Sequence, residues 1–377
     1  MLEFNYHLPV NLVFGRGKSD SLGEKAAVHG KRALVVTGGS STKRSGLLAK
    51  ALTLLTENGV AGILFDRVTP NPLTTTVYEG AELAVSEGCD LVVALGGGSS
   101  LDAAKGIAFQ AVNGGDINDY IFGRKLSGRA LPVVAVPTTC GTGSEANGFA
   151  VMTNPETLDK KSLRCNAIVP ACSIIDPLLM TTLPKATLAS VGFDALCHNI
   201  EAYLSAIVQP LTEIQALEGI RLALGSLRKV YADPSDLDSW DRLCLASTLG
   251  GMTIHCAGVT ALHGMEHPAS GLKDIVHGRG LAALAPHVYR ASVKSAPRKF
   301  SVLSALMGGK DENDFVLLLE ELIHDLHLTA TLGEQGLGRE DADWMTENCL
   351  KVSAAGLANH PLVFTPEKIK EIYLQAM

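Results

Sequence analysis

The chain has 377 residues, a length that suggests two domains. Hydrophobic residues make up 46% of it and charged residues 19%, which supplies a large core and argues against disorder. The net charge of −7 argues against a nucleic-acid or anionic-membrane partner, and no apolar run approaches the ~20 residues of a membrane span.

The cysteines and the N-terminus bear on the compartment. The eight cysteines form no CxxC pair, and a chain of this size does not need a disulfide framework. The first residues lack the basic segment followed by an apolar segment that marks a secretory signal. We therefore expect reduced thiols and a cytoplasmic location.

The first half of the chain alternates predicted strands with predicted helices. One or two strands are expected within residues 2–14, and others at 33–37, 60–65, 91–95 and 131–136. Helical spacing of apolar residues occurs at 45–57, 74–87 and 99–112. Uninterrupted Val and Leu runs separated by helices predict a parallel sheet that is covered on both faces.

The pattern changes after Asp176-Pro177. From about residue 185 apolar residues recur with the helical period, as at 315–328 and 369–377, and we find no strong strand. The sequence therefore predicts an α/β N-terminal domain of the Rossmann-like parallel-sheet type over residues 1–180. An all-α C-terminal domain is predicted over residues 181–377.

A glycine run, Gly96-Gly97-Gly98, joins the strand at 91–95 to the helix at 99–112. Free N–H groups and the helix dipole favour a phosphate there, and missing Cβ atoms let it approach closely. The run is neither GxGxxG nor a P-loop, so a tight turn without a ligand is the alternative. The hydroxyl-rich segment Pro137–Glu145 follows another strand and is expected at the same sheet edge, where ligands of open α/β sheets bind.

A second glycine turn, beginning at Gly38, follows the strand at 33–37. NAD sites often carry an acidic residue near the ribose hydroxyls, and this turn has none. Gly38 and Ser40, with the basic residues Lys43 and Arg44, would leave room and positive charge for the 2′-phosphate of NADP. The alternative is an ordinary turn with solvated basic side chains. If the turn binds a dinucleotide, it favours NADP over NAD.

Histidines and one aspartate have the spacing of a metal site. Asp194 and His198 are four residues apart in a predicted helix, His263 and His267 have the same spacing, and His277 follows. Residues at i and i+4 share one helix face. A carboxylate with three imidazoles suits Fe(II), Zn(II) or another divalent metal.

One segment also fits a different chemistry. His263-Gly-Met-Glu266-His267 matches the H-x-x-E-H signature of a metalloprotease, in which the glutamate is the base. Pro268 argues against a continuous metal-binding helix at that point. The metalloprotease also gives the glycine loops no role, so we keep it as a remote alternative.

Together these segments resemble the iron-containing (group III) alcohol dehydrogenase family, nearly from end to end. The resemblance is carried by Phe14–Gly17, Pro70–Pro72, Gly96–Ser99 with Asp102 and Lys105, Pro137–Glu145, Asp176-Pro177, Asp194–His198 with Glu201–Tyr203, His263–His267 and His277-Gly278. It implies a dehydroquinate synthase-like architecture with the active site between the two domains. It also implies metal-dependent, NAD(P)-linked hydride transfer to or from a small alcohol, and a homodimer or higher homo-oligomer.

The resemblance implies roles for individual residues. The metal ligands would be Asp194, His198, His263 and His277, and His267 would be a nearby proton relay. The cofactor's pyrophosphate would face Gly97, Gly98, Ser99 and Asp102, and its adenosine and nicotinamide would face Thr138, Thr139 and Thr142. Lys160 would lie near the nicotinamide ribose, and Asn71 at the adenine-side wall of the cleft.

The chain departs from the family pattern at several places. Glu266 stands where a small residue is more usual, and residues 252–256 and 359–361 differ from the common segments. A dehydroquinate synthase-like lyase would need a cluster of basic residues around 194–280, which we do not find. A metal-free maleylacetate reductase would not need the full Asp/His/His/His set. A non-catalytic metal- or nucleotide-binding module is the alternative from another class.

Overall fold

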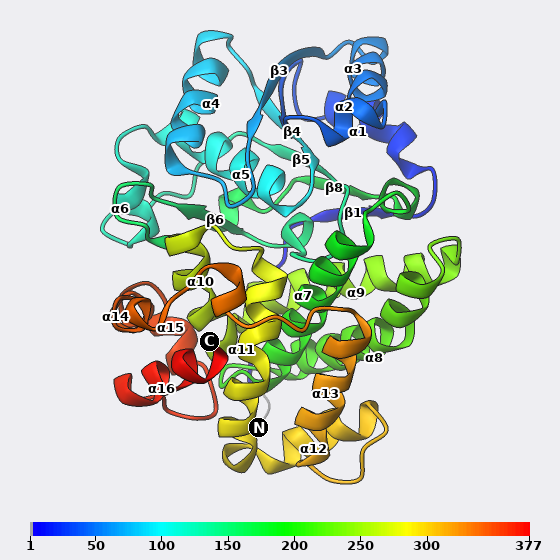
Figure 1. Ribbon diagram of the computed structural model, residues 1–377. Helices are drawn as coiled ribbons and strands as arrows, with labels where there is room; N and C mark the ends of the chain where they lie inside the picture. The colour runs from blue at the N-terminus through cyan, green and yellow to red at the C-terminus, as the bar shows by residue number, and fades with distance from the viewer. Residues whose placement is uncertain (1–2) are drawn as a thin grey trace.

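The computed structural model describes residues 3–377, so residue 2 of the predicted N-terminal strands lies outside the described residues. Figure 1 shows an α/β part that contains the sheet and a helical part that packs below it. This arrangement confirms the predicted fold class.

The sheet has six parallel strands in the order β1-β8-β5-β4-β2-β3. Their bounds are β1 Asn11–Phe14, β2 Arg32–Gly38, β3 Ala61–Val68, β4 Leu91–Gly96, β5 Val133–Pro137 and β8 Cys172–Ile175. Every residue of the central strands β4 and β5 is buried, as their unbroken apolar runs require. Strand β8 was not predicted from the sequence, because a four-residue strand gives a weak signal.

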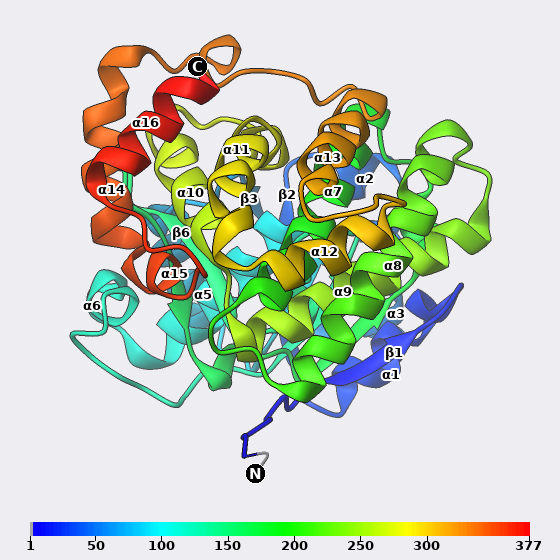
Figure 2. The same cartoon turned by 90° about the horizontal axis from the view of Figure 1, so that it is seen from below.

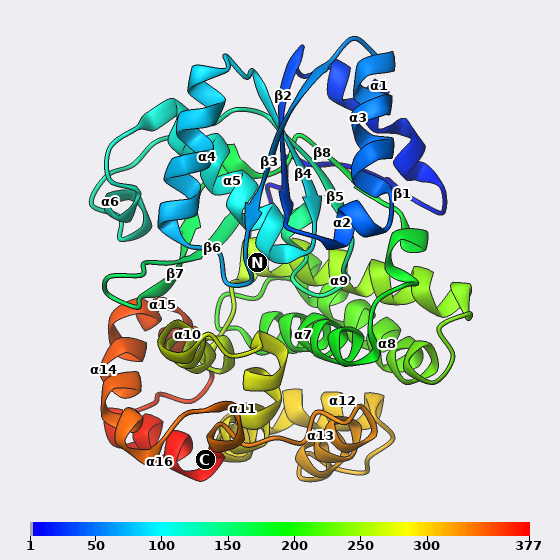
Figure 3. The same cartoon turned by 45° about the horizontal axis from the view of Figure 1, so that its top comes forward.

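Helices cover both faces of this sheet. They are α1 Leu22–Ala27, α2 Ser41–Arg44, α3 Leu47–Glu57, α4 Thr74–Ser86, α5 Gly98–Asn113 and α6 Ile117–Ile121. Helices α1 and α3 pack on one face and α4 and α5 on the other, as Figure 3 shows, and each side has its own apolar cluster. The helix expected at 45–57 begins at Leu47, because Gly46 adopts a φ of 77°.

A two-stranded antiparallel hairpin stands apart from the main sheet. It consists of β6 Phe149–Thr153 and β7 Lys160–Arg164. This hairpin was not predicted from the sequence, because β7 carries three basic residues and a serine among five positions. Such a composition does not resemble a core strand, and one face of the hairpin lines a cavity.

The second half is helical, as expected. Its helices are α7 Lys185–Leu204, α8 Pro210–Ala232, α9 Leu237–Ala257, α10 Ala261–Lys273, α11 His277–Ser292, α12 Pro297–Leu306, α13 Asp314–Asp325, α14 Ala342–Val352, α15 Ala354–Ala358 and α16 Pro366–Ala376. Figure 2 shows α14 and α16 along one side of this part and α8 along the other. Every residue of α7 from 192 to 204 is buried, so α7 is a core helix of this part.

Helix α10 continues through Pro268, and the expectation of a break there was wrong. Proline removes the N–H that would bond to the carbonyl four residues earlier. That carbonyl, on Gly264, accepts a hydrogen bond from Sγ of Cys349 at 3.3 Å instead. The tertiary contact thus replaces the missing helical bond.

The loop after β5 and helix α9 meet backbone to backbone. Gly143, at a φ of 58°, lies against Gly251, and a Cβ on Gly251 would be 2.0 Å from the Gly143 carbonyl oxygen. Only glycine at both positions permits this approach. The contact fixes the hydroxyl-rich loop on the helical part.

Among residues 3–377, no single helix has both the length and the apolarity to cross a membrane. Helices α9 and α10 meet that test only as a pair, with a bend of 102° between them.

Candidate metal and cofactor site

Helix α7 presents the first two residues of the predicted metal set. Asp194 and His198 lie one turn apart on the same face, as their spacing predicts. Oδ1 of Asp194 is 3.5 Å from Nδ1 of His198, and both side chains are buried. They line a cavity of about 800 Å³ between the sheet and the helical part.

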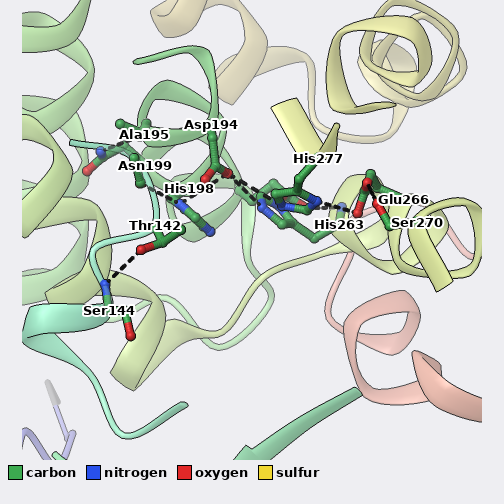
Figure 4. Close-up of polar contacts among 12 residues, drawn as sticks. Thr142, Ser144, Asp194, Ala195, His198, Asn199, His263, Glu266, Ser270 and His277 are labelled. Carbon is green, nitrogen blue, oxygen red and sulfur yellow. Dashed lines mark hydrogen bonds and ion pairs between the residues drawn. The ribbon is translucent and has the colours of Figure 1, made fainter. Parts of the chain in front are cut away.

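Helices α10 and α11 bring two more histidines to the same carboxylate. Nε2 of His263 lies 3.2 Å from Oδ1 of Asp194, and Nε2 of His277 lies 3.7 Å from it (Figure 4). One ligand atom from each of these three residues lies within 4.8 Å of the other two. That spacing is small enough for a single ion to contact all three.

His198 lies beside this convergent set. Its ring stacks on that of His263, with 4.4 Å between centroids and 19° between planes. Its Nδ1 is 3.2 Å from the carbonyl oxygen of Gly141. His198 is thus adjacent to the three convergent residues and faces the same cavity.

Buried carboxylates hold the outer nitrogens of two histidines. Glu201 contacts Nδ1 of His263, and its Oε1 accepts from the N–H and hydroxyl of Thr260 at 2.9 and 2.8 Å. Glu266 lies in close contact with Nδ1 of His277. A carboxylate behind a histidine fixes its tautomer and directs the other ring nitrogen inward, as second-layer partners of metal ligands do.

The charged groups in this cluster shift one another's pKa values. Burial alone would raise the pKa of Asp194 and Glu201, but the neighbouring histidines lower both, that of Glu201 to about 2. Burial opposes a charged His263, yet Glu201 and Asp194 raise its pKa to about 10. Burial lowers the pKa of His198 to about 4. Asp194 and Glu201 are therefore ionised, and their negative charge suits a cation.

Glu266 does not act as a protease base would. Its carboxylate is fully buried between His277, Ser270 and Lys160. His267, the second histidine of the signature, is not part of the convergent set. Its ring lies 6.3 Å from that of His263, and burial lowers its pKa well below the ordinary value.

Lys160 and Asn71 connect the sheet part to the helical part. Nζ of Lys160 donates to Oδ1 of Asn71 at 2.9 Å and lies 3.7 Å from Oε2 of Glu266. The Asn71 amide donates to Asp274 at 2.6 Å. Asn71 thus lies beside Lys160 and lines the same cavity as the histidine cluster.

The glycine run begins helix α5 at the edge of the cavity. Gly98 packs so closely on Thr142 that a Cβ there would lie 2.3 Å from its methyl group, whereas a Cβ on Gly97 would lie 3.1 Å from that of Thr139. Predicted cofactor residues that line the cavity are Asn71, Gly98, Ser99, Asp102, Thr142 and Lys160. The cavity therefore contains both the helix N-terminus and the metal candidates.

A buried polar network supports this loop. The Ser144 hydroxyl donates to Asp102 at 2.5 Å, and the N–H of Val151 donates to its other oxygen at 3.1 Å. Lys105, fully buried, donates to Ser144, to the carbonyls of Asn147 and Phe149 and to the Asn147 side chain at 2.8–3.1 Å. Asp102 is thus committed to the protein, although it also borders the cavity. A lysine so completely enclosed was not predicted as a site residue.

A second cavity extends along the neighbouring strand ends. It measures about 1410 Å³ and is lined by Thr138, by residues 41, 42, 44–47 and 50, and by residues 178, 179 and 182–184. Gly38 and Ser40 lie next to this lining. Arg44 donates to the Ser40 hydroxyl at 2.7 Å, while Lys43 is paired with Asp66.

Comparison with known proteins decides the family. Residues 9–177 match the family model described as iron-containing alcohol dehydrogenase, and residues 188–377 match that of the C-terminal domain of Fe-containing alcohol dehydrogenases. The chain belongs to the iron-containing alcohol dehydrogenase family. It is thus an oxidoreductase, and the lyase and protease alternatives are not favoured.

Relatives match over the whole chain. The 1,3-propanediol dehydrogenase of Citrobacter freundii is 36% identical, covering 99% of this chain and 98% of the relative. Alcohol dehydrogenase 4 of Saccharomyces cerevisiae is 32% identical, covering 98% of each.

Solved structures of this family agree in fold. A 1,3-propanediol oxidoreductase matches with a TM-score of 0.93 and 34% identity over 100% of both chains. An archaeal halo-thermophilic alcohol dehydrogenase from a Red Sea brine pool matches with a TM-score of 0.96 and 31% identity, again over 100% of both chains.

Proposed function

We propose that this protein is a divalent-metal-dependent, NAD(P)-linked alcohol dehydrogenase that interconverts a small alcohol and its aldehyde or ketone. The convergence of Asp194, His263 and His277 carries the proposal. A carboxylate and imidazoles within reach of one ion, two of the imidazoles backed by buried carboxylates, fit Fe(II), Zn(II) or a similar ion. His198, stacked on His263, is proposed as the fourth ligand.

The metal would polarise the substrate oxygen, and the nicotinamide would exchange a hydride with the carbon. The protein's own residues orient both partners. The N-terminus of α5, with Gly97, Gly98 and Ser99, is proposed to bind the pyrophosphate. Lys160, held by Asn71, is proposed to donate to the nicotinamide ribose.

His267 is the proposed proton relay. It lines the cavity, and its lowered pKa keeps the imidazole neutral near pH 7, so that a proton received from the alcohol is passed on rather than retained. Thr138, Thr139 and Thr142 are proposed to flank the adenosine and nicotinamide. The carboxylate of Asp102 is proposed to brace that loop rather than to contact the pyrophosphate, because both of its oxygens already accept hydrogen bonds.

Of the two nicotinamide cofactors, NADP is proposed to be preferred over NAD. The Gly38 turn has no side chain to exclude a 2′-phosphate, and Arg44, which donates to Ser40, supplies a nearby cation. Lys43 contributes less, because Asp66 neutralises it. NADP is therefore proposed to bind with Arg44 close to its 2′-phosphate.

Domain limits, assembly and compartment are also proposals. A cofactor domain over 1–180 and a metal domain over 181–377 fit the change from strands to helices. Eight free cysteines fit a reducing cytoplasm. A homodimer or higher homo-oligomer is expected from the family resemblance.

Anaerobic reconstitution tests the activity directly. The protein is loaded with Fe(II) or Zn(II) and mixed with NADPH or NADH and a panel of aldehydes, while the absorbance of reduced nicotinamide is followed. Steady oxidation that requires the metal is the expected result. Unchanged absorbance with every metal and cofactor would reject the proposal.

A further inference from the structure

The cavity has a wall that the proposed chemistry leaves unexplained. Successive side chains of a strand alternate between faces, and Lys160, Ser162 and Arg164 of β7 all line the cavity. Phe149 and Val151 of β6 pair with Arg164 and Ser162 in the antiparallel register and line the same cavity. One face of the hairpin thus combines two cations, a hydroxyl and two apolar side chains.

The two cations differ in their partners. Lys160 is buried, hydrogen-bonded to Asn71 and close to Glu266. Arg164 is exposed, and its guanidinium lies over the ring of Phe149 at 4.9 Å. Among residues 3–377, no carboxylate lies within 4.0 Å of Arg164, and its guanidinium donates no hydrogen bond. Arg164 is therefore a cation that faces the cavity without an anion.

The contact with Phe149 holds the guanidinium at the cavity wall. Its N–H groups form a planar fork that fits the two oxygens of a carboxylate. Arg164 also lines an adjoining cavity of about 930 Å³ that shares Ser162, Val259 and His267 with the first. It thus stands at the outer end of the proposed active site.

The cavity lining has two cations that are separated along strand β7. Lys160 lies near Glu266, and Arg164 lies four strand residues away, about 13 Å at ~3.3 Å per residue. Apolar side chains, Phe149, Val151, Ile254 and Val259, line the same cavity. This arrangement fits an aliphatic chain with a reacting oxygen at one end and an acid group at the other.

We infer that Arg164 selects substrates carrying a carboxylate at the end remote from the reacting carbon, that is, ω-carboxy aldehydes and the matching hydroxy acids. The inference rests on the proposed alcohol dehydrogenase function for its reacting end. The anion itself is recognised by Arg164 alone, through paired N–H···O bonds. Uncharged aldehydes of the same length lack that contact.

Matched substrates test the inference. Succinic semialdehyde and butanal have four carbons each and differ in the terminal carboxylate; 6-oxohexanoate and hexanal are the six-carbon pair. In at least one of these pairs, the metal-loaded enzyme should have a kcat/KM at least about tenfold higher for the carboxylate-bearing aldehyde than for the uncharged aldehyde. Arg164→Met should reduce that ratio about 10- to 100-fold, the range expected for charge-assisted hydrogen bonds. Arg67→Met is the control, since Arg67 pairs with Glu79 outside the cavity.

Binding separates this inference from the proposed function. Calorimetry with 4-hydroxybutyrate and 1-butanol measures affinity without turnover, in wild type and in Arg164→Met. If no aldehyde is reduced but 4-hydroxybutyrate binds through Arg164, the dehydrogenase proposal fails and the anion site stands. If the uncharged aldehydes are reduced as efficiently as the acids, or Arg164→Met lowers both equally, the anion site is refuted and the dehydrogenase stands.

Discussion

The buried carboxylate of Glu266, on helix α10, lies in close contact with Nδ1 of His277, the first residue of helix α11. Glu266→Gln should weaken metal binding about 10- to 100-fold, as loss of an outer carboxylate does. Competition with a chromogenic chelator measures this change.

Glu201→Gln is the natural comparison, because Glu201 contacts the outer ring nitrogen of another proposed ligand, His263. Glu320→Gln, at a surface pair with Arg290, is the control. If Glu266→Gln retains wild-type metal affinity while Glu201→Gln loses it, Glu266 does not position His277 for a metal.

The convergent histidines give the second prediction. His263→Ala and His277→Ala should each lose bound metal and turnover, because each removes a proposed ligand, while NAD(P)H binding persists. Metal content by elemental analysis and cofactor binding by fluorescence check both halves. His324→Ala, at an exposed position of α13, should retain both. Full metal content in either cavity variant would refute the ligand assignment.

The Gly38 turn gives the third prediction. A Cβ at Gly38 would lie 3.4 Å from the Val68 carbonyl and 3.8 Å from the Ser100 hydroxyl, so a side chain fits without strain. Gly38→Asp should shift the kcat/KM ratio of NADPH to NADH at least about tenfold towards NADH, since the carboxylate repels a 2′-phosphate and accepts from a 2′-hydroxyl. Arg44→Met should shift it in the same direction. An unchanged ratio in both variants contradicts the 2′-phosphate site.

Lys105 gives a pH prediction. Burial lowers its pKa to about 8, against 10.5 for an ordinary lysine, although Asp102 and Glu145 oppose the shift. Between pH 8 and 10.5 the unfolded chain therefore keeps a proton that the folded chain has lost. Folding stability should thus rise with pH across this window, by at most about 3 kcal/mol for a shift of this size.

Urea unfolding of wild type and Lys105→Met across this pH range isolates that group. The variant lacks the titration, so the wild-type free energy of unfolding should rise relative to that of the variant. Lys105→Gln substitutes if the methionine variant does not fold. A constant difference from pH 7 to 10.5 would mean that Lys105 titrates alike in both states.

The sequence predicted the parts of this structure that depend on local pattern. Apolar runs located β2, β4 and β5, and the four-residue spacing placed Asp194 and His198 on one helix face. The contact between Glu266 and Lys160 could not be predicted from the sequence, because 106 positions separate the two residues and only the packing of α10 against the hairpin brings them together. The same holds for Arg164, whose strand has no apolar signal, and for Pro268, whose helix is completed by distant Cys349.

The contact between Gly143 and Gly251 has a consequence for how this enzyme can vary. A methyl group added to either glycine would act as a wedge between the cofactor loop and the helical part, because it would meet backbone atoms within 2.6 Å. No side chain can yield to relieve that collision. At this contact main-chain atoms set the separation between the cofactor loop and the helical part, so substitutions elsewhere in the cleft can alter its chemistry while this spacing is kept.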